Sequence, residues 1–162
     1  MEIKELVHKI TTDLAVELAD EFDRNFERKG FFTEKWSSPK INNSRGSVLN
    51  RTGNLRRSIR YNVSDNSISF SSSLPYASIH NEGGEIVVTA QMKKFFWAMF
   101  YKSSGAEAMK WKGMALLKIG HKMKIEKRQF IGDHPEVARA VRIVVNENMT
   151  LFNEQILKQF NR

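Results

Sequence analysis

The chain has 162 residues, enough for one domain with a single hydrophobic core. Its 41% hydrophobic and 27% charged residues are typical of a folded protein and exclude an intrinsically disordered chain. The absence of cysteine excludes disulfide bridges, thiolate zinc sites and a cysteine nucleophile, and it fits synthesis in a reducing cytoplasm.

The net charge of +8 is distributed unevenly along the chain. Residues 1–30 carry five basic and eight acidic side chains, whereas residues 31–74 carry seven and two and residues 91–135 carry ten and three. Segments of opposite charge fit head-to-tail self-association, because complementary patches steer encounter and set register. The basic segments also fit contact with nucleic acid.

The sequence shows no pattern of a signal peptide or of a membrane span. Residues 1–6, Met-Glu-Ile-Lys-Glu-Leu, lack the basic and apolar regions of a signal peptide. No run approaches the roughly 18 apolar residues that cross a bilayer. We therefore expect a soluble protein that is not secreted by that route and has no membrane partner.

A long amphipathic helix is predicted over residues 2–29, ending at Gly30. Its apolar residues recur every three or four positions: Ile3, Leu6, Val7, Ile10, Leu14, Leu18, Phe22 and Phe26. Such a stripe fits either a coiled-coil seam or a helix lying on a sheet, and the aromatic residues near its end favour the sheet.

Residues 30–47 show no periodicity and contain many turn formers, which predicts a long loop. We expect Phe32 and Trp36 to anchor this loop against the core. Loops of this length are often functional. Its basic side chains make it either a segment that becomes ordered on a partner or a solvated connection.

Residues 49–84 are expected to form the centre of an antiparallel sheet on which the rest of the chain packs. Thr52 can cap a short helix that carries Leu55 and Ile59 on one face. Four arginines around this helix cannot all be buried and predict a cationic rim: Arg51, Arg56, Arg57 and Arg60. We expect charge reversal of Arg56 and Arg57 together to impair assembly and to leave folding intact.

The same stretch predicts a hairpin and a turn. Apolar and polar residues alternate within residues 61–70 around the turn formers Ser-Asp-Asn-Ser, which predicts two paired strands with one buried face. After Pro75 a single helical turn closes at two glycines, where a left-handed backbone carries no Cβ penalty. Residues 85–89, Glu-Ile-Val-Val-Thr, predict one more short strand.

A helical insertion of about residues 90–117 is predicted between two strands. Thr89 can cap its first helix, residues 91–101, which is apolar nearly all round and should be buried on two sides, under the loop or between subunits. Its central aromatic residues are candidates for an interface: Phe95, Phe96 and Trp97. A membrane-surface helix also has such lysines and aromatics, but no other feature supports an anchor. Residues 107–117 predict the second helix.

The C-terminal part predicts a strand and a second long helix. Residues 119–125 alternate apolar with polar side chains, and the outer face of this strand bears two candidate interface or DNA-facing residues: Lys122 and Lys124. The last helix begins near Pro135, capped by one of the two residues before it. Two long amphipathic helices, N-terminal and C-terminal, thus bracket an antiparallel β-sheet in a single α+β domain of residues 1–162.

Three motifs occur in order: L-x-x-T-G-x-L-x-x-S-I from Leu49, Y-A-x-I-H-N-x-G-G from Tyr76 and R-x-F-I-G from Arg128. Together they resemble the phage virion morphogenesis family, the tail-completion proteins of contractile-tailed phages and prophages. The resemblance covers the first helix to about Pro135, and the order of the motifs is its specific part. The motif residues are Thr52, Gly53, Leu55, Ser58, Ile59, Tyr76, Ala77, Ile79, His80, Asn81, Gly83, Gly84, Arg128, Phe130, Ile131 and Gly132.

The resemblance implies a structural, non-enzymatic protein that completes the tail or forms part of the head–tail neck, so that heads and tails can join. We expect it to self-associate, as a ring, and to contact the tail tube or sheath and head-connector proteins, with no cofactor. It would act in the bacterial host cytoplasm during assembly and then in the virion, encoded by a phage or a prophage. The insertion at residues 90–117 is longer and more aromatic than in the simplest members, so interfaces there cannot be copied.

The residues around His80, Ile-His-Asn-Glu-Gly-Gly, are the ones that invite a catalytic interpretation. A zinc deaminase would also need a Pro-Cys-x-x-Cys motif, which this chain cannot supply. The other histidines, His8, His121 and His134, show no metal-site spacing. A structural histidine whose ring bonds to a backbone group is therefore favoured. No phosphate-binding glycine loop, nucleophile elbow or carboxylate pair argues for an enzyme.

A small, basic, sequence-independent nucleic-acid-binding protein is the alternative. Two clusters of basic side chains could line one face and neutralise phosphates. They are Arg45, Arg51, Arg56, Arg57 and Arg60, and Lys118, Lys122, Lys124, Lys127 and Arg128. None of the familiar groove-reading modules is visible.

Overall fold

The computed structural model describes residues 2–38, 46–64 and 66–160. Part of the predicted loop, residues 39–45, and one residue of the predicted hairpin turn, Asp65, lie outside the described residues. Within the described ranges, no helix is both long enough and apolar enough to cross a membrane.

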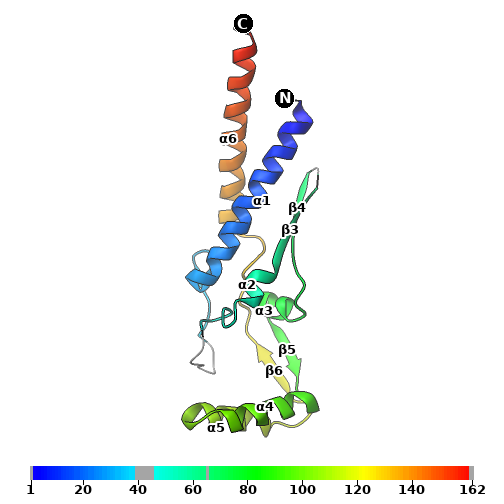
Figure 1. Cartoon of the computed structure of the whole chain (residues 1–162), viewed down its shortest axis with the longest axis vertical. Helices are drawn as coiled ribbons and strands as arrows, with labels where there is room; N and C mark the ends of the chain where they lie inside the picture. Colours follow the sequence, from blue (N-terminus) through cyan, green and yellow to red (C-terminus); the bar gives the residue numbers. More distant parts are fainter. Residues whose placement is uncertain (1, 39–45, 65, 161–162) are drawn as a thin grey trace.

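The protein is elongated, with helices at both ends and strands between them (Figure 1). The elements in chain order are α1 (Ile3–Arg28), β1 (Gly30–Phe31), β2 (Glu34–Lys35), α2 (Asn54–Ser58), β3 (Ile59–Ser64), β4 (Ser67–Ser72), α3 (Ala77–Glu82), β5 (Gly84–Val87), α4 (Ala90–Lys102), α5 (Gly105–Ala115), β6 (Lys122–Ile125) and α6 (Pro135–Phe160). The long helices α1 and α6 lie together at one end, and α4 and α5 lie at the other. The predicted α+β arrangement with two long terminal helices and a helical insertion is confirmed.

In the part of the chain that the structure describes, the strands form three separate two-stranded antiparallel ladders, and not the one sheet that the sequence led us to expect. β3 pairs with β4 from Ile59 opposite Ser72 to Ser64 opposite Ser67, which confirms the predicted hairpin. β5 pairs with β6, with Gly84 opposite Ile125. The short helix α3 turns the chain between β4 and β5, so the second ribbon leaves in a new direction and carries α4 and α5 away from the body (Figure 1).

The apolar face of α1 forms the core of the body. Its buried residues are Leu6, Ala15, Leu18, Phe22, Asn25 and Phe26. Phe22 packs edge-on against Phe70 of β4, with 4.9 Å between the ring centroids, and the cluster around it extends to Val137 and Ala140 of α6. The helix therefore lies on the β3–β4 hairpin, as predicted, and packs against α6 as well.

A polar clasp joins α1 and α6 farther from the body. Asn148, buried on α6, accepts a hydrogen bond from Nζ of Lys9 at 2.7 Å and donates one to Asp13 at 3.0 Å. The hydrogen bonds from Lys9 and Asn148 hold the pKa of the Asp13 carboxyl below its usual value. Because a buried amide needs its hydrogen bonds, these contacts of Asn148 favour one register between α1 and α6.

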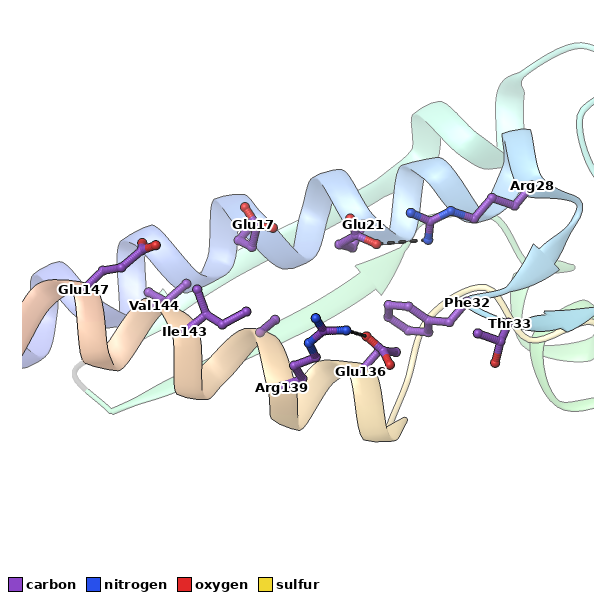
Figure 2. Close-up of a pocket in the computed structure, with 11 residues that line it drawn as sticks. Glu17, Glu21, Arg28, Phe32, Thr33, Glu136, Arg139, Ile143, Val144 and Glu147 are labelled. Carbon is purple, nitrogen blue, oxygen red and sulfur yellow. Dashed lines mark hydrogen bonds and ion pairs between the residues drawn. The ribbon is translucent and has the colours of Figure 1, made fainter.

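A groove of about 540 Å³ runs between α1 and α6 (Figure 2). Its apolar floor comes from Phe32, Ala140, Ile143 and Val144, and four carboxylates and two arginines surround it: Glu17, Glu21, Glu136, Glu147, Arg28 and Arg139. Salt bridges join Glu21 to Arg28 and Glu136 to Arg139. Glu17 of α1 and Glu147 of α6 line the groove at different positions along it and have no salt-bridge partner among the described residues.

The helix starts agree with the sequence in two places and differ in one. Thr89 accepts a hydrogen bond from the backbone N–H of Met92 and caps α4 as predicted. His134, one of the two predicted caps of α6, accepts one from Glu136 through Nδ1. At α2 the N-cap position is taken by Gly53 and not by the predicted Thr52, although the Thr52 hydroxyl accepts a long hydrogen bond of 3.4 Å from the backbone N–H of Asn54. Gly53 is left-handed, with a φ of 73°, which a residue with a Cβ would resist.

Arg56 fastens α2 to α1 and does not belong to a free cationic rim. Its guanidinium donates to both oxygens of Asp23 and, at 2.7 Å, to Glu27. These contacts, that with Asp23 foremost, raise the pKa of Arg56 above its usual value. Arg57 instead donates to the Thr52 carbonyl and the Asn54 side chain of its own turn. Because Arg56 holds α2 against α1, we expect reversal of its charge to lower stability as well as to impair assembly.

We expect Arg56→Ala to lower the free energy of unfolding by about 1–2 kcal/mol, because it removes charge-assisted hydrogen bonds between partly exposed groups. Arg57→Ala is the matched control, and its loss should stay below about 0.5 kcal/mol. Urea denaturation of the two variants measures the difference. Equal losses would contradict a clamp at Arg56.

Candidate functional site

The three motif stretches meet at the C-terminal end of α1. Leu55, Ala77 and Phe130, one from each stretch, form a buried cluster with Phe26 of α1. Phe130 is completely buried, and its ring centroid lies 5.3 Å from that of Phe26. We call this meeting point the motif junction. Residues far apart in the sequence therefore pack together here as one cluster.

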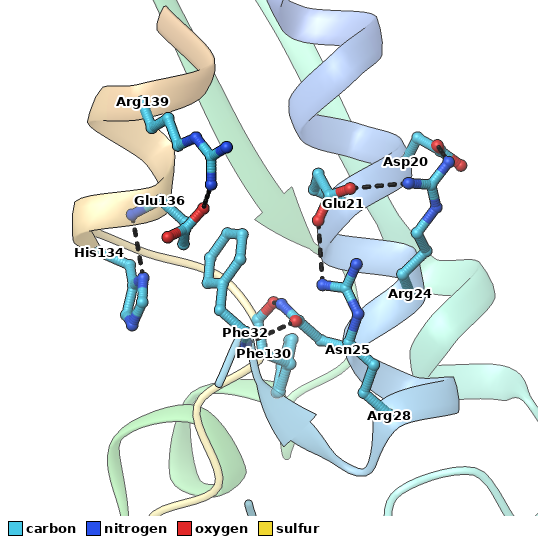
Figure 3. A network of polar contacts seen from close by, with 10 residues as sticks. All are labelled: Asp20, Glu21, Arg24, Asn25, Arg28, Phe32, Phe130, His134, Glu136 and Arg139. Atoms are coloured by element: carbon cyan, nitrogen blue, oxygen red, sulfur yellow. Dashed lines mark hydrogen bonds and ion pairs between the residues drawn. The ribbon is translucent and has the colours of Figure 1, made fainter. Parts of the chain in front are cut away.

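Asn25 of α1 holds two other segments at the motif junction (Figure 3). Its side-chain nitrogen donates to the Phe130 carbonyl at 3.2 Å, and its side-chain oxygen accepts from the backbone N–H of Phe32 at 2.9 Å. Asn25 is fully buried. Because an unpaired polar group would be costly there, both bonds fix the path of the chain.

Asn81 of α3 bonds to the same segment from another element. Its side-chain oxygen accepts the backbone N–H groups of Phe130 at 2.9 Å and Ile131 at 3.1 Å. The N–H of Arg128 donates to the His80 carbonyl at 2.8 Å. Residues 128–131 have no strand partner of their own, so side chains of α1 and α3 take the place of a sheet.

The loop after α1 is anchored at the junction by the two residues that the sequence predicted. The indole N–H of Trp36 donates to the Gln129 carbonyl at 2.7 Å. Phe32 stacks on His134, with 4.7 Å between ring centroids. The backbone of Phe32 has a φ of 53°, a left-handed conformation unusual for a residue with a Cβ, and the bond from Asn25 helps hold it.

Gly83 is required by the close approach of two segments. It adopts a φ of 76°, and an added Cβ would lie 2.9 Å from the backbone nitrogen of Lys127. Gly132 makes the turn before α6 with a φ of 134°, as the resemblance implied. Gly83 and Gly132 therefore allow backbone conformations at the junction that other residues would resist.

His80 lies half-buried on α3 beside the ring of Tyr76. Its Nδ1 is buried and has no hydrogen-bond partner among the described residues, so this nitrogen does not make the bond that was predicted between the ring and a backbone group. Burial, together with the nearby charge of Arg128, lowers the pKa of His80 below its usual value. The described residues contain no group of three His, Asp or Glu side chains placed to hold a metal ion.

The other predicted contact residues are dispersed over the surface. Arg51 and Arg60 are exposed near α2. Lys122 pairs with Glu85 across the β5–β6 ribbon at 3.3 Å, and Lys124 is exposed on the same outer face. Arg128, nearly buried, lies near Glu126 at 3.7 Å. With Arg56 also paired, the two basic clusters of the nucleic-acid hypothesis contribute fewer free cations than the sequence suggested.

The helices α4 and α5 form a hairpin of their own with an aromatic core. Phe96, Trp111 and Ala115 are buried in it, and the rings of Phe96 and Trp111 stack at 6.1 Å. Phe95 is 54% exposed and Tyr101 78% exposed on the outer side of α4. One of the two predicted buried sides of α4 is therefore covered by α5, and the other faces solvent.

Some residues that shape these features were missed in the sequence. Asn25 interrupts the apolar stripe of α1 three positions after Phe22, and Asn148 interrupts that of α6 in the same way. An asparagine at a core position of an amphipathic helix could have indicated a hydrogen bond to another element, because buried amides are almost always hydrogen-bonded. The carboxylates of the groove gave no signal, because they become neighbours only when α1 and α6 pack.

The structure defines an α+β protein whose motif residues serve chain path and packing and whose apolar surface is exposed at both ends. A model of the phage virion morphogenesis family matches residues 3–150. The chain therefore belongs to the phage virion morphogenesis family, which gives it a structural role in the assembly of phage particles. No curated protein and no solved structure matches the chain significantly.

The bonds of Asn81 predict a difference between two substitutions. Asn81→Ala should lower the free energy of unfolding by about 2–3 kcal/mol, because it leaves the N–H groups of Phe130 and Ile131 unpaired. Asn81→Asp retains an acceptor oxygen and should lose less than half as much. Chemical denaturation at pH 7 measures both. The role assigned to Asn81 is wrong if both variants lose the same amount.

The lowered pKa of His80 predicts a dependence of stability on pH. A neutral ring is favoured in the folded state, so its contribution is present above the unfolded pKa of 6.5 and is lost as the pH falls through the folded value. The free energy of unfolding should therefore decrease between about pH 7 and pH 5, and His80→Gln should decrease less. Parallel curves for the two proteins would show that His80 does not titrate in this way.

Proposed function

We propose that this protein completes the phage tail or forms part of the head–tail neck, so that heads and tails can join. It does so by self-association, as a ring, and its partners are the tail tube or sheath and head-connector proteins. It acts in the host cytoplasm during assembly and afterwards in the virion. Membership of the virion morphogenesis family supports a role in assembly. The neck position and the ring are the proposal.

The observation that carries the proposal is the exposed apolar surface at both ends of the elongated subunit. At one end Phe95 and Tyr101 of α4 are exposed, and Met109 of α5 is 63% exposed. At the other end Ile143 and Leu151 of α6 are about half exposed. Surface of this kind marks contacts with other proteins, and two such ends suit subunits that associate in series.

Free basic side chains would face a central channel of such a ring and tolerate passing DNA. Arg51 and Lys124 are exposed and have no ion-pair partner among the described residues. Contact of this kind neutralises phosphates without reading sequence. The alternative function, sequence-independent binding of nucleic acid, uses the same side chains, and its affinity would fall steeply as salt is raised.

Deletion of the gene from its parent phage or prophage tests the proposal. We expect electron microscopy of the lysate to show full heads beside separate, unjoined tails. Complementation with the wild-type gene should restore joined particles and serves as the control. Normally joined virions from the deletion strain would overturn the proposal and favour the nucleic-acid alternative.

A further inference from the structure

The outer face of α4 carries a narrow exposed stripe. Its members recur at helical spacing and are all exposed, although the ring of Phe95 also touches Trp111 of α5. They are Lys94, Phe95, Ala98, Tyr101 and Lys102. The opposite face of α4 packs on α5 through Phe96. An apolar centre with a cation at each end is the pattern of a helix that lies in a groove of another protein.

The lysines of this stripe have no ion-pair partner within residues 2–38, 46–64 and 66–160. Neither Lys94 nor Lys102 forms a salt bridge with a carboxylate of the part of the chain that the structure describes. The hairpin around them is strongly basic, since residues 90–118 contain six lysines and a single acidic residue, Glu107. The surface that receives α4 should therefore present carboxylates beside an apolar floor.

The groove between α1 and α6 has these properties (Figure 2). Ile143 and Val144 provide an apolar floor, and Glu17 and Glu147 stand at its sides without a salt-bridge partner among the described residues. Its lining residues extend over 12 residues of each helix, about 16 Å along the axis, and the stripe spans about 12 Å. The lengths and the charges are complementary.

The stripe and the groove lie at opposite ends of the molecule, so one subunit cannot join its own two surfaces (Figure 1). Two copies can join them head to tail. Such a contact uses different surfaces on the two partners and leaves one of each free, so it continues to a closed ring when the rotation between subunits allows.

We infer that the α4 stripe of one copy lies in the α1–α6 groove of the next copy. Phe95 and Tyr101 then cover Ile143 and Val144, and Lys94 and Lys102 pair with Glu17 and Glu147. The occupant of the groove is therefore a second copy of this chain. The inference rests on the proposed self-association and names the surfaces that produce it.

A charge-swap series on the isolated full-length protein tests the contact. Reversing the cations, K94E with K102E, or the carboxylates, E17K with E147K, should weaken self-association at least about 100-fold, because like charges then face each other. Combining all four substitutions should restore it. Light scattering after gel filtration measures the association, and circular dichroism checks that each variant is folded.

Two control pairs have the same charge changes elsewhere. The first pair, K110E with K118E, changes a lysine of α5 and one just after it. The second pair, E82K with E154K, changes two carboxylates outside the groove. Neither pair should reduce self-association by more than about threefold. The inferred contact is overturned if the controls weaken association as much as the test pairs, if the fourfold variant fails to recover, or if the wild-type protein remains monomeric. Loss of association in the lysine variants alone would also overturn it and assign those lysines to another partner, such as nucleic acid.

Failure of this contact and failure of the proposed function give different results. If the charge-reversed variants still self-associate while the gene deletion leaves heads and tails unjoined, the interface is wrong and the proposed function stands. If the deletion strain makes joined virions, the proposed function fails whatever the variants do.

Discussion

The backbone at Phe130 and Ile131 is bonded from two sides, by Asn81 of α3 and by Asn25 of α1. This segment pairs with no strand of the described chain, so its polar groups would be costly to bury without the two amides. The position of the segment determines where α6 begins and where β6 ends. The packing of α6 on α1, and hence the groove, depends on the same bonds.

The motif junction separates two ends of the protein that expose different surfaces. The β5–β6 ribbon carries α4 and α5 away from the body, and their aromatic core holds them together without help from it. The ring of Phe95 touches Trp111 of α5 at its edge, and more than half of the side chain stays exposed. In an assembly protein, surface left uncovered in the monomer is surface available to the next subunit.

Much of the fold could be predicted from local patterns. The period of 3.6 residues located α1 and α6, Thr89 marked the start of α4, and the anchors Phe32 and Trp36 were recognisable in the loop. The strands were located, but their division into three ladders was not, because strand pairing depends on the turn at α3 and not on the pattern of each strand. The motif residues were identified from the resemblance, whereas the partner of Arg56 on α1 and the groove follow only from tertiary packing.

Hydrogen exchange on the free and the assembled protein tests the central claim, that a rigid junction presents α4 and the α1–α6 groove to neighbouring copies. The account predicts that the amides of Phe130 and Ile131 are strongly protected in both states. It predicts that assembly adds protection at residues 94–102 and at residues 143–147. Fast exchange at the junction in the free protein, or added protection confined to other segments, would contradict it.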